Sequence, residues 1–240
     1  MKTRIIACFI LLAMLFSTSA LASSLTWNEL NGEEYGATVA AHVFADTLTE
    51  LSGGSLTIDL YINGDMGSEA ESMQGLQWGT LDIFRGNASS LPNYGAELIG
   101  ATGLPYVFTD MAQFEEVAES EFGQELLDSV EQADCGYIAL AWLVEGPRSL
   151  FVTEKAWRKM GSPQSVTLDI MQGLNIRVPD TDLMRGTMQA LGAIATPITY
   201  SELYKSLRAD SIDGAENGVT SYMSANFNEV APYFITDAHT

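Results

Sequence analysis

The sequence has few positive charges. Its 240 residues include 11 Lys and Arg against 31 Asp and Glu, which gives a formal net charge of −20. Nucleic acid is a poor partner for such a surface, because affinity for nucleic acid depends on basic residues that displace counterions. We therefore expect no nucleic-acid partner, and we interpret the acidity as a determinant of solubility rather than of fold.

Cysteine and histidine are also scarce, with two of each. Cys8 lies in an apolar N-terminal run, so Cys135 alone remains beyond it and no internal disulfide is expected. The sequence contains no HExxH motif and no cysteine cluster, which argues against zinc. It also lacks GxSxG, GxGxxG and GxxxxGK[ST], so serine hydrolases and nucleotide-binding proteins lack support. We expect no metal, no cofactor and no enzymatic activity.

The one long apolar run lies at the N-terminus and is typical of an export signal. Two basic residues precede the run from Ile5 to Phe16, and Ala20 and Ala22 occupy the small positions that a signal peptidase reads. The run is too short for a permanent span. We therefore expect residues 1–22 to be a signal peptide that is cleaved after Ala22 and directs the protein to the periplasm. A permanent membrane anchor is the alternative.

Beyond this signal, strand-like and helix-like patterns alternate along the chain. Period-two apolar patterns predict strands, and apolar residues three or four positions apart predict helices. Their alternation favours an α/β fold, and the 47% hydrophobic content is enough for two lobes with packed cores. The predicted strands are 56–61, 81–84, 137–142, 149–152, 175–178 and 194–198. The predicted helices are 40–51, 70–76, 114–130, 181–191 and 201–208.

Two arginines lie next to predicted strand ends, Arg148 in EGPRSLF and Arg177 in GLNIRVPD. A planar guanidinium suits bidentate capture of a carboxylate, and ligands of α/β proteins collect at strand ends and between lobes. Taken alone, each arginine is more often a solvated surface residue. The polar stretch 213–217, DGAEN, is interpreted as a turn when taken alone.

Several motifs in order carry a family resemblance over Leu51 to His239. They are SGGSLTIDLYINGDMGSEAE, LQWGTLDI, GLPYVF, EGPRSLF, GLNIRVPD, LGAIATPITYSELYKSLRADSIDGAEN and NEVAPYFITDAH. The set resembles the solute-binding proteins of tripartite ATP-independent periplasmic (TRAP) transporters, of the C4-dicarboxylate type. The resemblance implies a two-lobed periplasmic binding protein-like fold with a hinge and an interlobe cleft. With EGP (145–147) at the boundary, the lobes are 23–145 and 146–240.

The resemblance also implies a function and a site. A monomeric protein would close on a small organic acid and deliver it to the membrane subunits of the transporter. Arg177 would pair with the ligand carboxylate, and Arg148 would add a second contact. Other family positions that reach or line the pocket are occupied here by Asn217, Tyr200, Asn87 and Glu69, with Asn28 as a further candidate. A periplasmic sensor that binds a ligand and an enzyme that uses two carboxylates are the alternatives.

The sequence departs from the family pattern in three places. Gly218 follows the DGAEN motif where the family usually has proline, and the stretch between Arg148 and Arg177 is longer than usual. Family members also continue well past the position of His239, whereas this chain stops at Thr240. We therefore expect a chain truncated at its C-terminus, which lacks the return segment of the first lobe and the closing helices of the second and leaves apolar surface uncovered.

Overall fold

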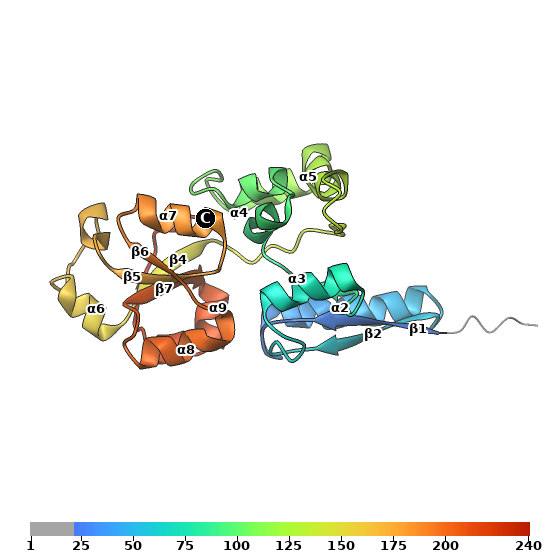
Figure 1. The fold of residues 1–240 in the computed structure, drawn as a ribbon, viewed down its shortest axis with the longest axis horizontal. Helices are drawn as coiled ribbons and strands as arrows, with labels where there is room; N and C mark the ends of the chain where they lie inside the picture. The colour runs from blue at the N-terminus through green and yellow to red at the C-terminus, as the bar shows by residue number, and fades with distance from the viewer. Residues whose placement is uncertain (1–21) are drawn as a thin grey trace, which may run out of the picture.

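The computed structural model describes residues 22–240, so the expected signal peptide lies outside the described residues apart from Ala22. The described chain contains two β-sheets, each with its own helices (Figure 1). The strands of the first sheet end at Phe84, and those of the second begin at Arg148. This two-lobed α/β architecture confirms the expected fold class. We call residues 23–145 the first lobe and 146–240 the second lobe; the position of their boundary stays a prediction.

The first lobe contains a parallel sheet with the strand order β2-β1-β3. Helix α3 (Glu69–Trp78) begins with a capping box, in which Ser68 and Glu71 bond to each other's backbone, and ends at Gly79 with a φ of 68°. The elements of this lobe are β1 (Ser23–Asn28), α2 (Gly36–Leu51), β2 (Leu56–Tyr61), α3 (Glu69–Trp78), β3 (Ile83–Phe84), η1 (Ala88–Tyr94), η2 (Leu98–Gly103), α4 (Met111–Ala118) and α5 (Glu121–Gln132).

The single long helix predicted over 114–130 is wrong, because the structure has two helices there, α4 and α5. The side chain of Ser120 accepts a hydrogen bond from the backbone N–H of Gly123 and starts the second helix. A Cβ atom at Gly123 would lie 2.3 Å from the carbonyl oxygen of Val117, so glycine permits the close approach of the two helices. The apolar period continues across the break and therefore does not reveal it.

The strand predicted over 137–142 is also wrong. The segment belongs to no sheet among the described residues, and the side chains of Ile138 and Leu140 are 64% and 68% exposed. A strand requires hydrogen bonds to a neighbouring strand, and no described strand pairs with this one. An apolar run alone cannot show whether that neighbour is present.

The apolar face of α2 points largely to solvent. Val43 and Leu51 are 61% and 82% exposed, whereas the buried side of the helix is made of small residues, including Ala37 and Ala41. The small side chains allow α2 to lie close to the sheet. The prediction of a helix here is therefore correct, but the apolar residues that led to it do not lie on the buried face.

The second lobe contains a mixed sheet with the strand order β6-β5-β7-β4-β8. Strand β5 is parallel to β6 and β7, and β4 is antiparallel to β7 and β8. Helix α7 lies on one face, and α8 and α9 lie on the other (Figure 1). The elements are β4 (Arg148–Val152), α6 (Glu154–Lys159), η3 (Leu168–Met171), β5 (Asn175–Val178), α7 (Asp182–Ala190), β6 (Ile194–Pro197), α8 (Tyr200–Arg208), β7 (Gly214–Gly218), α9 (Val219–Ser224), η4 (Phe227–Glu229) and β8 (Tyr233–Ile235).

The stretch DGAEN, interpreted alone as a turn, supplies most of β7, which is the central and fully buried strand of the second sheet. Its glycine is required by packing, because a Cβ atom on Gly214 would lie 2.3 Å from the carbonyl oxygen of Phe151. Charged and amide side chains in a central strand are unusual, and this is why the sequence pattern pointed to a turn instead. Their burial indicates that they have partners.

Alternate residues of each strand pack into cores on opposite faces of the second sheet. Leu174, Ile176 and Val178 lie in the core beneath α7, at most 2% exposed, which confirms the predicted apolar face of β5. Phe151 lies in the opposite core with α8 and α9. Arg177 faces this second side, since its register neighbour on β7 is Ala215 of that core.

Candidate functional site

Arg177 is buried in the second lobe without a carboxylate partner. Its side chain is 4% exposed, and its Nε donates a hydrogen bond to the carbonyl oxygen of Ile198 at 2.7 Å. None of the ion pairs found among residues 22–240 includes this arginine. Burial lowers its pKa to about 10, against the opposing effect of the Glu216 charge. At neutral pH it is a buried cation that can accept an anionic ligand.

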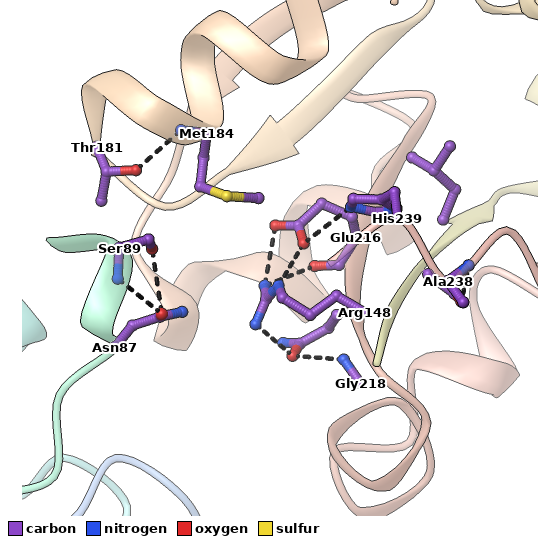
Figure 2. A network of polar contacts seen from close by, with 12 residues as sticks. Asn87, Ser89, Arg148, Thr181, Met184, Glu216, Gly218, Ala238 and His239 are labelled. Carbon is purple, nitrogen blue, oxygen red and sulfur yellow. Dashed lines mark hydrogen bonds and ion pairs between the residues drawn. The ribbon is translucent and has the colours of Figure 1, made fainter. Parts of the chain in front are cut away.

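Arg148, in contrast, is bound by an internal carboxylate (Figure 2). Its Nε and Nη2 donate to the two carboxylate oxygens of Glu216 at 2.5 and 2.9 Å, and Nη1 donates to Oδ1 of Asn217 at 3.2 Å. Nη2 also donates to the main-chain oxygen of Glu216 at 3.2 Å. Burial alone would raise the pKa of Glu216, but the charges of Arg148 and His239 outweigh it and lower this pKa to about 2.

His239 extends this network. Its Nε2 lies 3.7 Å from a carboxylate oxygen of Glu216, and its Nδ1 lies 2.8 Å from one of Asp237. Burial alone would lower the pKa of His239, but its contacts with Asp237 and Glu216 raise it to about 9. Glu216 and His239 are therefore both charged at neutral pH, beside the cation of Arg148. Sequence patterns alone assigned no role to His239 or Glu216.

Asn217 is held in place by its neighbours on both sides. Besides the hydrogen bond from Arg148, its Oδ1 accepts one from the backbone N–H of Gly218 at 2.8 Å. Proline has no N–H to donate, so the glycine that departs from the family pattern allows a hydrogen bond that proline would remove. The departure therefore has a structural consequence at the candidate site.

A third arginine, largely buried, lies in the first lobe and was missed by sequence reasoning. Arg85 donates through Nε and Nη2 to both carboxylate oxygens of Glu29, each at 2.6 Å, and its Nη1 lies 2.9 Å from Glu145. Its guanidinium carbon lies 5.6 Å from the centre of the Tyr35 ring. The position of Arg85 directly after a predicted strand was a signal of the same kind that singled out Arg177.

Glu69 and Asn87 come together at the edge of the first lobe. Glu69 is the first residue of α3, and its Oε1 accepts hydrogen bonds from the backbone N–H of Asn87 at 3.4 Å and from the Ser90 hydroxyl. Oδ1 of Asn87 accepts from the backbone and hydroxyl of Ser89. Figure 2 shows Asn87 across from Arg148 of the second lobe. The charge of Glu69 also acts to raise the pKa of Arg177, so the two groups face one region.

Tyr200 begins α8, and its hydroxyl is buried without a hydrogen-bond partner among the described residues. Burial raises its pKa, while the charge of Arg177 lowers it. The Tyr200 hydroxyl does not bond to Ser221, whose own hydroxyl instead donates to that of Tyr35 across the lobes at 3.2 Å. Burial raises the pKa of Tyr35 to about 12. Tyr200 thus places an unused polar group beside Arg177.

The side chain of Asn28, the further candidate, is already occupied by hydrogen bonds within the first lobe. Its side chain is fully buried and its amide donates to the main-chain oxygen of Gly67 at 3.0 Å and to Ser72 at 2.7 Å. Its Oδ1 accepts from the backbone N–H of Met66 at 3.3 Å. Asn28 therefore holds the loop between β2 and α3, and none of its polar atoms remains for a ligand.

The two lobes touch around these residues. The Asn93 side chain donates to the main-chain oxygen of Asp180 at 3.0 Å and accepts from the backbone N–H of Asp182 at 3.4 Å. The backbone N–H of Tyr106 donates a hydrogen bond to the carbonyl oxygen of His239 at 2.8 Å. Arg177, Arg148, Asn217 and Tyr200 thus lie in one lobe and Glu69 and Asn87 in the other, at the interface between the two.

Within residues 22–240, no three His, Cys, Asp or Glu side chains are grouped so that they could hold a metal ion. No helix in the same part of the chain combines the length and the apolar character needed to cross a membrane.

Comparison with known proteins places this geometry in a family. A family model described as bacterial extracellular solute-binding protein, family 7, matches residues 28–240. A solute-binding protein of Roseobacter denitrificans is 31% identical over 99% of this chain and 70% of its own length. A solute-binding protein of Chromohalobacter salexigens is 29% identical over 95% of this chain and 65% of its own length. The chain thus spans about two thirds of the length of these relatives.

Solved structures give the same result. A TRAP periplasmic solute-binding protein of Bradyrhizobium, in complex with galacturonate, has a TM-score of 0.81 and 31% identity over 90% of this chain and 69% of its own. The Roseobacter protein, with bound L-galactonate, has a TM-score of 0.78 and 29% identity over 90% of this chain and 68% of its own. From the family model and these relatives, the chain belongs to the bacterial extracellular solute-binding proteins of family 7.

Proposed function

We propose that this protein is the solute-binding component of a TRAP-type transporter, and that it binds a small organic acid between its lobes and delivers it to membrane subunits. The observation that carries the proposal is Arg177, a buried cation without a carboxylate partner among the described residues. Burying an unpaired charge is costly, so such an arrangement is retained where a ligand supplies the missing charge. Family membership and the acids bound by the two relatives support it.

The ligand contacts follow from the groups that remain free. Arg177 binds the carboxylate, and Tyr200 offers its buried hydroxyl beside it. Arg148 has five N–H donors, of which four are used, so it contributes a single hydrogen bond. Asn217, Asn87 and Glu69 complete the contacts with the remainder of the acid.

The proposed mechanism is capture by lobe closure, without turnover of the ligand. The backbone passes between the lobes at residues 145–148, where Gly146 has a φ of 94° that favours glycine. An acid that contacts Arg177 on one side and Glu69 or Asn87 on the other stabilises the closed arrangement, because only that arrangement offers both sets of contacts. The closed form is the one that docks on the membrane subunits.

We further propose that residues 1–22 direct export to the periplasm and are removed after Ala22. Intact-mass measurement of the protein recovered from the periplasm tests this, and a mass that begins at Ser23 is the expected result. Retention of the first 22 residues would contradict it.

Arg177→Ala tests the binding function directly. Truncating one member of a desolvated charge pair costs about 2–5 kcal/mol, which is ~30-fold to a few thousandfold in Kd. Calorimetric titration with galacturonate, galactonate and short organic acids should show this loss for every acid that binds the unaltered protein. Arg158→Ala is the matched control, because Arg158 is exposed on α6 and pairs only with Glu154. A change of less than about threefold for Arg177→Ala would sink the anchor role.

A further inference from the structure

We propose that the site between the lobes selects acids with one carboxylate and a hydroxyl-bearing remainder, and that Glu69 excludes a second carboxylate. The inference rests on the proposed function, because it concerns the acid that binds at the same site. It follows from counting which buried charges at the lobe interface are already paired and which are left for a ligand.

Arg85 is not available to a carboxylate. Its guanidinium is bound by both oxygens of Glu29, which is fully buried, and it also contacts Glu145. One cation thus faces two carboxylates, so this part of the first lobe has no positive charge in excess. A carboxylate placed here would meet a net negative surrounding.

Arg148 is likewise neutralised. Glu216 binds it in a bidentate manner and is fully buried, and the cation of His239 is balanced by Asp237 at 2.8 Å. The network of four groups carries no net charge. Its free N–H can donate one hydrogen bond to a hydroxyl or to one oxygen of an acid, but it has no excess charge for a second carboxylate.

Arg177 therefore supplies the single uncompensated positive charge among the three buried arginines. Its Nε is bound to the carbonyl of Ile198, and both terminal nitrogens remain for one carboxylate in the bidentate geometry that guanidinium groups favour. The site has the charge for one carboxylate and no more.

Across the interface the free groups are suited to hydroxyls. Oε1 of Glu69 accepts two hydrogen bonds, whereas no hydrogen bond reaches its Oε2 among the described residues. A carboxylate oxygen only accepts, so it can bind a hydroxyl but repels a second carboxylate. The amide nitrogen of Asn87 and the hydroxyl of Tyr200 are also without partners in the described residues, and both can bond to hydroxyl groups. A sugar acid with one carboxylate meets both requirements.

Matched acids that differ at one end test this selectivity. Galactonate and galactarate share the same open chain of hydroxyls, and only galactarate has a carboxylate at both ends; glycerate and tartronate form a shorter pair. Calorimetric titration of the protein at pH 7.5 should give a Kd for the monocarboxylate at least ~30-fold below that of its dicarboxylate partner in each pair that binds. Dicarboxylate binding within threefold of its partner, or tighter, contradicts the inference while leaving the proposed function intact. Failure of galacturonate and of every other acid to bind contradicts both.

Glu69→Gln tests the residue assigned to the exclusion. Removing its charge while keeping its shape should reduce the ratio of the two Kd values by about tenfold, chiefly through tighter binding of the dicarboxylate. Glu125→Gln is the matched control, because it makes the same change of charge on the exposed side of α5 and should leave the ratio unchanged. An unchanged ratio in a folded Glu69→Gln protein contradicts the role of Glu69, and the matched acids on the unaltered protein decide the selectivity independently.

Discussion

Arg177 and Arg148 lie in the same sheet and are both largely buried, yet their surroundings differ. Arg148 has a bidentate carboxylate partner at 2.5 and 2.9 Å, which raises its pKa although burial alone would lower it. Arg177 has a main-chain carbonyl instead, and burial lowers its pKa to about 10. Arg177 is therefore the arginine whose charge responds to pH and to a ligand.

This difference predicts how binding depends on pH. The ligand carboxylate binds the charged form of Arg177, which is complete well below pH 10 and is lost as pH rises through its pKa of about 10. The Kd should be constant between pH 7 and 8.5 and should increase above pH 10 toward about tenfold per pH unit. Calorimetric titrations from pH 7 to 10.5, with circular dichroism to confirm folding, measure this.

His239 supplies the control, because it also titrates near this range, with a pKa of about 9. His239→Gln removes that titration and should leave the loss of binding above pH 10 in place. A Kd that stays constant to pH 10.5 in both proteins would show that Arg177 keeps its charge throughout.

The sequence predicted part of this site and missed another part. Arg177, Arg148 and Asn217 could be selected because each lies in a motif of recognisable spacing. Arg85 carried a weaker signal, its position after a predicted strand, but its partner Glu29 and the role of Glu216 depend on which strand pairs with which: β7 brings Glu216 beside Arg148, although 68 positions separate them. Local patterns do not contain such long-range pairing.

At the scale of elements, the junction of α4 and α5 depends on one glycine. Gly123 is buried inside α5, and a Cβ atom there would lie 2.3 and 2.5 Å from the carbonyl oxygens of Val117 and Ala118. Real Cβ atoms do not approach backbone oxygens so closely, so the two helices would have to separate. The junction is thus fixed by packing rather than by helix propensity.

Gly123→Ala should therefore lower the free energy of unfolding by about 1–3 kcal/mol, against the usual benefit of alanine in a helix. Gly186→Ala is the matched control, because Gly186 lies exposed within α7 with nothing within 4 Å of its Cβ position. That change should raise stability by up to ~1 kcal/mol. Urea denaturation of the two variants compares them, and equal effects would show that the α4–α5 contact is not tight.

Elements with strong local signals agreed with the structure, and those that depend on distant partners did not. Strand β5 has the predicted bounds, and α7 begins after Thr181, whose side chain caps it. The strand expected over 137–142 and the turn expected over 213–217 were wrong, because the first lacks a described partner strand and the second gains two. Pairing, not composition, decides whether such a segment becomes part of a sheet.

The whole molecule has an uneven distribution of charge. Residues 22–145 hold 21 Asp and Glu and one Arg, whereas residues 146–240 hold ten Asp and Glu and eight Lys and Arg. Nearly all of the net negative charge of the described chain thus lies in the first lobe. Like charges at this density destabilise a compact lobe through mutual repulsion, which salt screens within about 10 Å at ~0.1 M.

Raising NaCl from ~0.02 to ~0.5 M should therefore stabilise the first lobe more than the second. Amide hydrogen exchange measured at both concentrations should show a greater gain of protection in β1 and β2 than in β5 and β7. An equal gain in both sheets would indicate a general effect of salt on the protein, and no gain would show that the carboxylates are too far apart to interact.

The predicted crossing between the lobes is flanked on both sides by largely buried arginines. Glu145 contacts Arg85 of the first lobe, and three residues later Arg148 is bound by Glu216 of the second. Only Gly146 and Pro147 lie between these anchors, and proline fixes its own φ. Of the two residues between the anchors, Gly146, with a φ of 94°, is therefore the one whose φ is less restricted. Such a joint has little conformational freedom to lose when it closes, and more of the binding energy of the acid is left to appear as affinity.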